Sequence, residues 1–346
     1  MNKNLIDRPY GRFHYIPKIL AEKGHNVTIL YLNYKNEPPD YDYVNNMHCH
    51  TISIFRSFGL GYFLKACQIT KTVNPDWVIG FSDTYFGILA NYIAHKYNTH
   101  SLIDAYDNFE SYIPWLKPIH FLWRQALSSA EVVTAAGPEL AENMSQYRSN
   151  RPTHVVPMAA DPHFPTKLTK GQCRSKLNLS KNKILIGYCG SIYKNRGIEH
   201  FFKATQILNK EDNDFQFIIS GQLDPQVEIP THINWLGYIQ DEDLPLLIKS
   251  MDLLVVVNQD SLFGNFSYPV KLYEAISTNI PVIATSTPPI KGILADHPEL
   301  LIPHNNPKEI AEKIKEILKI SSIKYSNLSS WEPITDNFES ILKNHK

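Results

Sequence analysis

The chain has 346 residues, and its 34 basic side chains equal its 34 acidic side chains, which gives a formal net charge of zero. A neutral chain has no general attraction to nucleic acid, so we expect no nucleic-acid partner. The length suits two domains, and no apolar run approaches the roughly 20 residues that span a bilayer. The four cysteines form no CxxC pair, which favours reduced thiols and a cytoplasmic protein.

The first clear element is an amphipathic helix over residues 12–23, followed by an apolar strand rich in β-branched residues over 26–32. Residues 1–7 are too few and too polar for the opening strand of a doubly wound domain. We therefore expect that this strand is missing because the sequence starts late or the coding sequence is truncated. A missing central strand would leave buried backbone groups of its neighbours unpaired.

Strands and helices then alternate at short spacing, which indicates a parallel sheet. Predicted helices cover 59–73, 85–96 and 137–147, and predicted strands cover 76–81, 100–103 and 131–135. Polar residues that follow two of these strands are expected in loops: Ser82, Asp83, Asp104, Asp107 and Glu110.

The segment 111–125 mixes aromatic residues with Lys117 and Arg124. Aromatic and basic side chains suit a membrane interface, so this segment predicts peripheral contact with a membrane. The alternative is a loop and helix that pack on the sheet.

In the second half, a strand over 184–188, a loop over 190–196 and an amphipathic helix over 197–208 follow one another. Gly190 allows a ligand to approach the backbone, and Arg196 offers a planar, permanently charged fork for a diphosphate. A strand over 215–220 precedes Gly221, and a short strand ends at Gly237. Later helices begin after Asp241, at 306 and at 331.

The most informative stretch covers residues 252–285. An apolar strand over 253–257 is followed by a polar loop, a helix that begins at Pro269 and a second buried strand over 281–284. Ligands of open α/β sheets bind outside the carboxyl ends of the strands, where this loop and helix begin. Lys271 and Glu274 share one helical face there. They offer a cation for an anion and a carboxylate for hydroxyl groups.

The strings SYPVKLYEAIS and PVIAT in this stretch resemble the donor-binding motif of retaining glycosyltransferases of the GT-B fold, most of all family 4. The resemblance implies an α/β protein with two Rossmann-like, doubly wound parallel-sheet domains that face a cleft. It implies that Glu274 holds the ribose of a nucleotide sugar, with Ser267 and Leu272 also at the donor. The first acidic residue of the family's E-x7-E pattern is replaced here by Phe266.

The loop after 184–188 resembles the phosphate loop of the same family, with Gly190, Arg196 and Gly197 at matching positions. Relatives often carry an arginine where this chain has Ser191, so Arg196 and Lys271 would supply most of the positive charge. Three further donor-binding positions follow from the resemblance: Gly221, Tyr238 and Ile239.

The string RPYGRF resembles the first loop of the family and places Gly11 at the donor, and VVPMAADPHF resembles its interdomain crossing near Phe164. These similarities imply an acceptor domain over 1–164, completed by a terminal helix over 331–346, and a donor domain over 165–330. Asp107 is the candidate for a polar contact with the sugar or the acceptor. A solvated acid or a helix cap is the alternative for this residue.

The resemblance implies a metal-independent, retaining hexosyltransferase of cell-surface polysaccharide or glycoconjugate synthesis. The donor would be a UDP- or GDP-linked sugar, as a substrate and not a cofactor, and the acceptor a glycan or a lipid-linked glycan. Arg196, Lys271 and Asp107 would form the catalytic set, in which the two basic groups neutralise the leaving diphosphate. The enzyme would work in the cytoplasm, with contact to the inner face of the cell membrane. A nucleotide-sugar epimerase and a non-catalytic binding protein are the alternatives.

Two Asp-x-Asp patterns, at 40–42 and 241–243, are of the type that can hold Mg²⁺ or Mn²⁺. The first is predicted to lie in a loop, and the second at a helix start, where acids cap unpaired N–H groups. His48, Cys49 and His50 are adjacent residues of a strand-like segment, so their side chains alternate between faces. We therefore predict no metal site.

Overall fold

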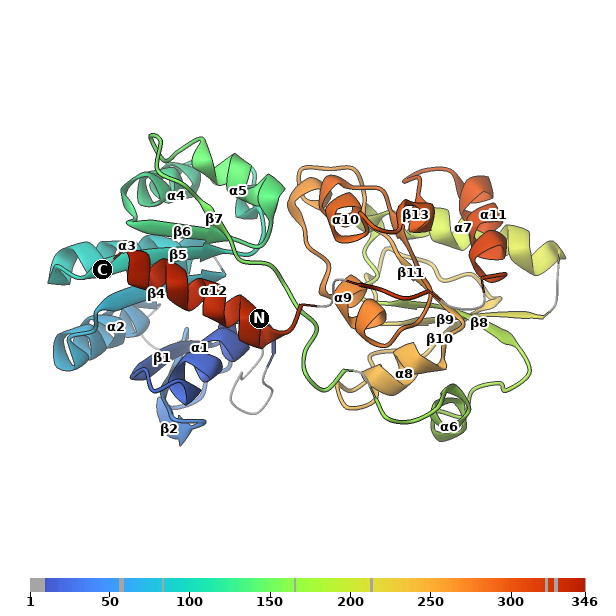
Figure 1. The fold of residues 1–346 in the computed structure, drawn as a ribbon, viewed down its shortest axis with the longest axis horizontal. Coiled ribbons are helices and arrows are strands. Elements are labelled where there is room, and N and C mark those ends of the chain that lie inside the picture. The colour runs from blue at the N-terminus through green and yellow to red at the C-terminus, as the bar shows by residue number, and fades with distance from the viewer. Residues whose placement is uncertain are drawn as a thin grey trace. The chain divides into compact units, whose positions relative to one another are not determined.

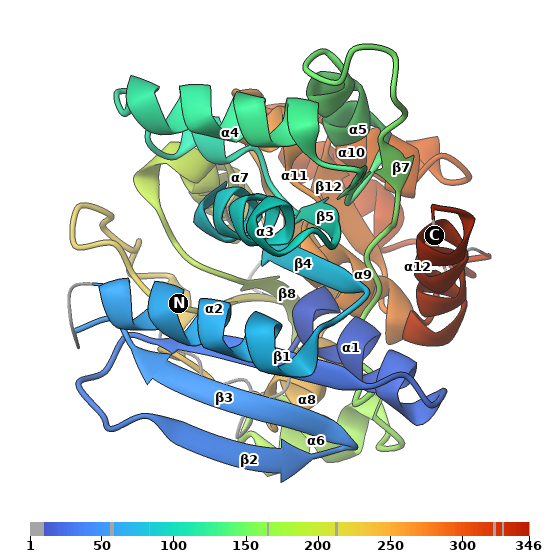
Figure 2. The ribbon, with the colours of Figure 1, turned by 90° about the vertical axis from the view of Figure 1, so that its left-hand side faces the viewer.

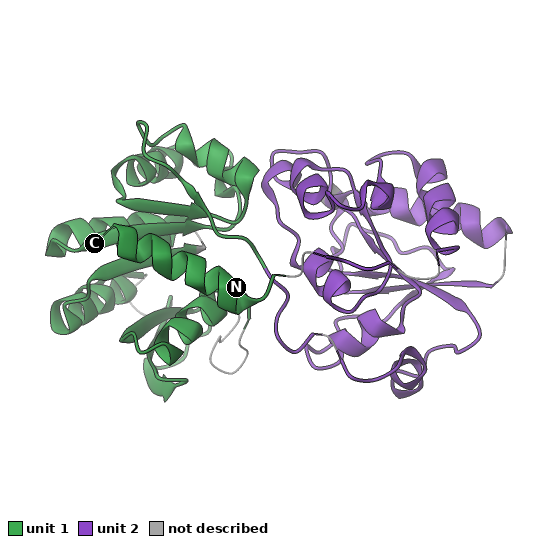
Figure 3. Cartoon of the chain, in the orientation of Figure 1, with its two compact units in different colours: residues 1–158, 329–346 green, residues 159–328 purple. Residues whose placement is uncertain are grey.

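The computed structural model describes residues 10–55, 59–82, 84–164, 166–211, 214–320, 323–326 and 329–345. The chain divides into two compact units (Figure 3): unit 1 comprises residues 1–158 and 329–346, and unit 2 comprises residues 159–328. The division falls after Met158, whereas the sequence placed it near Phe164. Among the described residues, no helix combines the length and the apolarity needed to cross a membrane.

Among its described residues, unit 1 has a three-stranded and a four-stranded sheet (Figures 1 and 2). One is a parallel sheet in the order β4-β5-β6-β7, and the other has the order β1-β3-β2, in which β2 is antiparallel to β3. The predicted loop at 40–42 is therefore wrong, since Asp40 and Asp42 lie in β2. The strands are β1 (Val27–Asn33), β2 (Asp40–Val44), β3 (Met47–Ser53), β4 (Trp77–Ser82), β5 (His100–Ala105), β6 (Val132–Ala135) and β7 (His154–Val155).

The β2–β3 hairpin turns at Asn45 and Asn46, whose φ angles are 51° and 62°. Two consecutive positive φ angles are what a tight two-residue hairpin requires, and asparagine tolerates them well. The Asn-Asn pair therefore explains how the polar strand β2 can be joined to β3 by a turn of only two residues.

Within the described residues, β1 is an edge strand of the three-stranded sheet of unit 1, and β4 is an edge strand of its four-stranded sheet. The Tyr62 hydroxyl, from α2, donates to the carbonyl oxygen of Leu30 on β1 at 2.8 Å, so one backbone acceptor of this strand is paired by a side chain. The prediction of a missing opening strand concerns residues 1–7, which lie outside the described residues.

The last helix of the chain, α12, packs on the first, α1, inside unit 1 (Figure 1). The ring of Trp331 stacks on that of Tyr15 at 5.7 Å, and Lys23 donates to Glu339 at 2.8 Å. The helices of the unit are α1 (Arg12–Glu22), α2 (Leu60–Val73), α3 (Thr84–Tyr97), α4 (Lys117–Ser129), α5 (Pro138–Ser145) and α12 (Trp331–Asn344), with a short 3-10 helix η2 (Phe109–Ser111).

Unit 2 is built on one parallel sheet in the order β10-β9-β8-β11-β12-β13. The order reverses between β8 and β11, and in doubly wound sheets ligands bind at such a reversal. The strands are β8 (Ile184–Cys189), β9 (Phe215–Ser220), β10 (Ile233–Trp235), β11 (Leu253–Val256), β12 (Val282–Thr285) and β13 (Leu301–Ile302). The helices are α6 (Lys170–Lys176), η3 (Lys194–Arg196), α7 (Ile198–Glu211), α8 (Leu244–Ser250), η4 (Gly264–Phe266), α9 (Val270–Ser277), α10 (Pro288–Ile293), η5 (Pro298–Leu300) and α11 (Pro307–Ile317).

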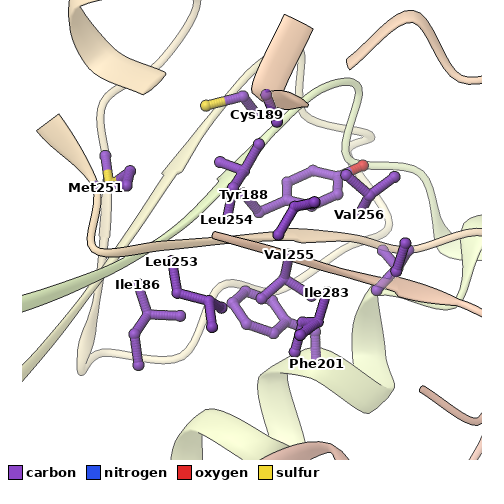
Figure 4. Packing of buried hydrophobic residues seen from close by; sticks show 14 of the residues in the cluster. Ile186, Tyr188, Cys189, Phe201, Met251, Leu253, Leu254, Val255, Val256 and Ile283 are labelled. Carbon is purple, nitrogen blue, oxygen red and sulfur yellow. The ribbon is translucent and has the colours of Figure 1, made fainter. Parts of the chain in front are cut away.

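The core of unit 2 explains why its strands read as unbroken apolar runs. All four residues of β11 and of β12 are buried, as expected for a parallel sheet covered on both faces. Figure 4 shows side chains of β8, β11 and β12 gathered with Phe201 of α7. A Cβ atom on Gly187 would come within 2.8 Å of the Met251 side chain, so the missing side chain lets that methionine pack against β8.

Candidate functional site

The candidate site lies at the carboxyl edge of the unit 2 sheet, where β8 and β11 are parallel neighbours. Parallel strands end at the same edge, so the loop after β8 (190–197) and the loop after β11 (257–269) leave the sheet side by side. Both loops lead into helices, α7 and α9. The geometry therefore brings together the two stretches that the sequence singled out.

Three glycines pack backbone against backbone at this edge. Gly221 has φ +141°, and a Cβ atom there would lie 1.8 Å from the carbonyl oxygen of Gly190. The Gly221 N–H donates to the carbonyl oxygen of Gly237 at 2.9 Å. A side chain at Gly221 would push these turns apart, so glycine is required for the ends of β8, β9 and β10 to meet.

Arg196 ends η3, and its guanidinium lies against two aromatic rings. The central carbon is 4.8 Å from the ring centre of Phe263, in the loop after β11, and 5.5 Å from that of Tyr193. Within the part of the chain that the structure describes, no carboxylate pairs with it. Gly197 follows with φ +83° and allows the chain to leave η3 and enter α7. The loop after β8 thus presents a cation whose charge is not cancelled.

Lys271 and Glu274 form an ion pair on α9, with Nζ 2.7 Å from Oε2. The Glu274 side chain is 2% exposed and that of Lys271 is 29% exposed. Burial lowers the pKa of Lys271, but the Glu274 carboxylate outweighs this effect, and the net shift is upward. Lys271 is therefore protonated and its charge is locally balanced, whereas the sequence suggested an independent cation.

The last two residues of β8 are Tyr188 and Cys189, which are both labelled in Figure 4. Their pKa values respond to Arg196 and to the Lys271–Glu274 pair. Burial raises the pKa of Tyr188 to about 12, and the charge of Arg196 acts in the opposite direction. Burial also raises the pKa of Cys189 to about 12, with Lys271 opposing the shift and Glu274 adding to it. Both basic side chains thus lie within electrostatic reach of consecutive residues at the end of β8. The Cys189 thiol is protonated at neutral pH.

The other positions predicted in unit 2 differ in their surroundings. Tyr238 is 54% exposed just after Gly237, and Ser267 is buried ahead of α9. Ile239 is half-buried against the core. Leu272 is fully buried in the core and its N–H donates to the carbonyl oxygen of Pro269 at 2.9 Å. Its side chain therefore supports α9 from within, and its place at the donor stays a prediction. Ser191 lies half-buried in the loop after β8, and its carbonyl oxygen accepts from the Tyr188 hydroxyl at 2.9 Å.

Asp107 and Gly11 belong to unit 1. Asp107 follows β5, is buried, and accepts a hydrogen bond from the Tyr112 hydroxyl at 3.2 Å. Gly11 precedes α1 with φ +63°, and its carbonyl oxygen accepts from the N–H of Tyr15 at 3.0 Å. Asp107 is thus a buried, hydrogen-bonded acid, which differs from the solvated acid considered as its alternative.

Asp104 was expected in a loop, and this is corrected by the structure, which places it inside β5. It pairs with Arg12 at 2.6 Å, and neither side chain is exposed. The Thr134 hydroxyl also donates to it at 2.5 Å, and Arg12 donates to the carbonyl oxygen of Val156 at 2.9 Å. This buried pair joins α1 to the parallel sheet. Sequence reasoning missed this pair, because it placed Arg12 at the start of a helix and assigned it no partner.

The residues that the sequence analysis considered for metal binding are described next. Cys49 is buried, while His48 is exposed and hydrogen-bonded to the Tyr41 hydroxyl at 2.8 Å. Asp243 is the residue before α8, but its side chain makes no capping hydrogen bond, contrary to expectation. In the described ranges, no group of three or more His, Cys, Asp or Glu side chains is placed to hold a metal ion.

Two family models match the chain, one in each half. Residues 14–164 match the model described as Glycosyltransferase Family 4. Residues 170–330 match the model described as Glycosyl transferases group 1. Together the two matches cover both units.

One curated relative is the capsular polysaccharide biosynthesis glycosyltransferase CapM of Staphylococcus aureus. It is 23% identical over 189 residues, which cover 48% of each chain. The chain spans about half the length of the curated relatives it matches.

Solved structures share the fold over nearly the whole chain. Sucrose-phosphate synthase from Thermosynechococcus elongatus is 15% identical with a TM-score of 0.72, over 96% of this chain and 92% of that one. HepE from Anabaena, solved in complex with UDP, is 13% identical with a TM-score of 0.69, over 96% of this chain and 90% of that one. At these identities the likeness concerns the fold.

Proposed function

Because the chain belongs to the glycosyltransferases of family 4 type and has their GT-B fold of two Rossmann-like domains, we propose that it transfers a sugar from a nucleoside-diphosphate sugar to a glycan or lipid-linked acceptor. The observation that carries the proposal is that two groups act on consecutive residues at the end of β8, where the strand order of unit 2 reverses: the Lys271–Glu274 pair, and the Arg196 guanidinium, which no carboxylate pairs with in the described part of the chain. A cation at that point fits a diphosphate.

In this proposal, Arg196 neutralises the charge that develops on the diphosphate as the glycosidic bond breaks. Its fork can donate two parallel hydrogen bonds to phosphate oxygens. The amino-terminal ends of α7 and α9 add N–H dipoles that favour the same charge. All of these groups are in place before the donor arrives, so little reorganisation is needed.

The Lys271–Glu274 pair has a second task, which is to hold the ribose and one phosphate together. An ammonium group has three N–H donors, and one is used for Glu274. A carboxylate has about four acceptor sites, so Glu274 has the chemistry to accept from a ribose hydroxyl as well as from Lys271. The pair would thus fix the donor's position without adding net charge.

We propose a UDP- or GDP-linked donor, with Gly190, Ser191, Gly197, Gly221, Tyr238, Ile239 and Ser267 lining the nucleotide. HepE, which shares the fold of this chain, was solved in complex with UDP, and this supports the choice. The sugar is transferred with retention and without a metal, since the departing phosphate serves as the base and no protein nucleophile is needed. Cys189 fits this scheme because its thiol stays protonated. Asp107 and Gly11 would serve the sugar and acceptor side from unit 1.

The proposed acceptor belongs to a cell-surface polysaccharide, which the relative CapM supports. The four cysteines are all free and buried, as in proteins of a reducing compartment, so we place the reaction in the cytoplasm.

We also propose contact with the inner face of the membrane through an exposed apolar face of unit 1. Trp115, Phe121 and Leu122 are 74%, 61% and 47% exposed. The opposite face of α4 packs on α3, where Trp123 would meet a Cβ atom on Gly87 at 2.5 Å. Trp123 thus packs within unit 1, while the three exposed side chains would be the ones to meet lipid.

Calorimetry against UDP and GDP, followed by a screen of nucleotide sugars with and without acceptor glycans, tests the main proposal. Transfer with unchanged anomeric configuration, insensitive to EDTA, is expected. Epimerised donor in the absence of acceptor would indicate the epimerase, and nucleotide binding without turnover would indicate the binding protein. For the membrane contact, sedimentation with anionic lipid vesicles should fall when Trp115 and Phe121 are both replaced by serine.

A further inference from the structure

The Arg196 guanidinium is held by aromatic rings where ion pairs usually hold a buried or half-buried arginine. We propose that Phe263 and Tyr193 are positioning residues, an aromatic clamp that orients Arg196 for the diphosphate of the donor. The inference rests on the proposed function, and it concerns residues that no motif of the sequence singled out.

The clamp joins two loops that are far apart in sequence. Tyr193 lies three residues before Arg196, and the Arg196 N–H donates to the Tyr193 carbonyl oxygen at 3.1 Å, so the turn brings the guanidinium back toward the ring. Phe263 comes from the loop after β11, with its ring centre 4.8 Å from the guanidinium carbon. Both distances to ring centres are within the range of a cation–π contact.

The loop that carries Phe263 is held by hydrogen bonds between its own residues. The Asn265 N–H donates to the carbonyl oxygen of Ser261 at 2.9 Å, and the Asn265 amide donates to Asp260 at 2.8 Å. A Cβ atom on Gly264 would lie 1.9 Å from the carbonyl oxygen of Gln259, so only glycine permits this tight turn. The ring of Phe263 therefore has a fixed support.

Rings and carboxylates hold an arginine with different consequences for a bound anion. A carboxylate would cancel the charge and occupy the N–H donors that a phosphate needs. An aromatic ring contacts the planar face of the guanidinium and leaves its five N–H donors, which lie in the plane, available. The clamp thus restricts the side chain and keeps both its charge and its hydrogen-bonding capacity.

The neighbouring Lys271 shows the opposite arrangement, since Glu274 balances its charge at 2.7 Å. The same loop carries Phe266 at the position eight residues before Glu274, so it brings no acid toward Arg196 from there. The positive charge that a diphosphate meets is then mainly that of Arg196, and its orientation decides the affinity.

The test compares Phe263→Leu, which removes the ring but keeps apolar bulk, with Phe263→Tyr, which keeps the ring. A matched control is Phe215→Leu, the same substitution at the first residue of β9, where the strands of the sheet begin. We expect Phe263→Leu to weaken UDP or GDP binding roughly 5- to 30-fold in calorimetry. Phe263→Tyr and Phe215→Leu should bind as the wild type does. Tyr193→Leu should act in the same direction as Phe263→Leu.

The decisive comparison repeats Phe263→Leu in an Arg196→Ala background. If the ring acts through the guanidinium, the second substitution adds no further loss of nucleotide binding. A full loss in both backgrounds would overturn the proposal, because the ring would then contact the nucleotide directly or only fold the loop. Equal binding by wild type and Phe263→Leu would overturn it as well.

A second measurement separates the clamp from the proposed function. The rate at which phenylglyoxal modifies Arg196, followed by peptide mass spectrometry, should rise in Phe263→Leu and stay unchanged in Phe215→Leu. If the wild type binds neither UDP nor GDP, the donor assignment fails, and the modification rate alone decides whether the rings hold Arg196. An unchanged rate would refute the clamp.

Discussion

In the unit 2 sheet, charged side chains are paired differently at the amino edge, where the strands begin, and at the carboxyl edge, where they end. At the amino edge, Asp252 accepts hydrogen bonds from Lys170 at 2.8 Å, from Arg174 at 2.5 Å and from the N–H of Leu185 at 2.7 Å. At the carboxyl edge, the contacts of the Arg196 guanidinium among the described residues are with the aromatic rings of Tyr193 and Phe263. Mutually satisfied charges hold elements together, whereas a cation supported without an acid remains available for an anion. The difference separates a structural cluster from a binding site on one sheet.

The Lys271–Glu274 pair lies between these extremes. It is an ion pair like that of the amino edge, but it lies at the start of α9, beside the end of β8. Its expected behaviour is therefore mixed, with one contribution to stability and one to donor binding. Variants of Arg196, of the Asp252 cluster and of the Lys271–Glu274 pair should differ in their effects on turnover and stability, and they follow from the largest expected effect to the smallest.

The largest effect is expected for Arg196→Ala. Turnover should fall about 100-fold, equivalent to about 3 kcal/mol of transition-state stabilisation, while the free energy of unfolding falls by only about 1 kcal/mol, for the two ring contacts that are lost. Steady-state kinetics with saturating donor and thermal unfolding measure the two quantities. An unchanged rate at saturating donor would remove Arg196 from the catalytic set.

Arg174→Met tests the amino edge. The arginine also donates to the carbonyl oxygens of Ser250, Lys181 and Lys183, so its loss should lower the free energy of unfolding by about 2–3 kcal/mol. Turnover per folded molecule should stay the same. Lys313→Met is the control, because its ion pair with the exposed Glu316 should contribute less than about 0.5 kcal/mol. Lost activity in a folded Arg174→Met protein would contradict the contrast between the edges.

Lys271→Met should affect both quantities moderately. Glu274 would remain buried without its cation, at a cost of about 1–2 kcal/mol of stability, and donor turnover should fall about 10-fold. Adding Glu274→Gln should recover stability but not activity, because the amide needs no cation. If the double variant regained activity, the pair would have only a structural role.

The smallest effect concerns pH. Burial raises the pKa of Asp252, but Lys170, the Leu185 N–H and Arg174 outweigh it, and the net shift is downward. A depressed folded-state pKa gives stability that is present above the unfolded value of about 3.9 and lost as the pH falls below it. The thermal midpoint should therefore drop between pH 5 and pH 3 more steeply in the wild type than in Asp252→Asn. Parallel curves would show that the cluster adds no pH-dependent stability.

The sequence predicted unit 2 better than unit 1, for a physical reason. Strands buried on both faces, such as β11, appear as unbroken apolar runs, and the helix at Lys271 follows from Pro269 and its periodicity. The polar β2 gave no such signal, although Asn45 and Asn46 could have indicated a hairpin. The family motifs singled out Arg196 and Glu274, which lie in the segments that follow the neighbouring strands β8 and β11, and their roles at a donor stay predictions.

The rest of the site depends on contacts between distant segments. No pattern in the sequence places Phe263 beside Arg196, which is 67 positions earlier. The ion pair of Arg12 with Asp104 is equally non-local. Such contacts arise from the packing of loops and helices on the sheets, and short motifs do not encode them.

The return of α12 to unit 1 has a consequence for synthesis on the ribosome. Unit 2 is inserted between the two parts of unit 1, since residues 159–328 are translated before 329–346. Domains generally fold as units once their chain has emerged. The later-encoded unit can therefore be finished first, and the amino-terminal unit must wait for the final helix, with the Tyr15 side of α1 uncovered until Trp331 arrives.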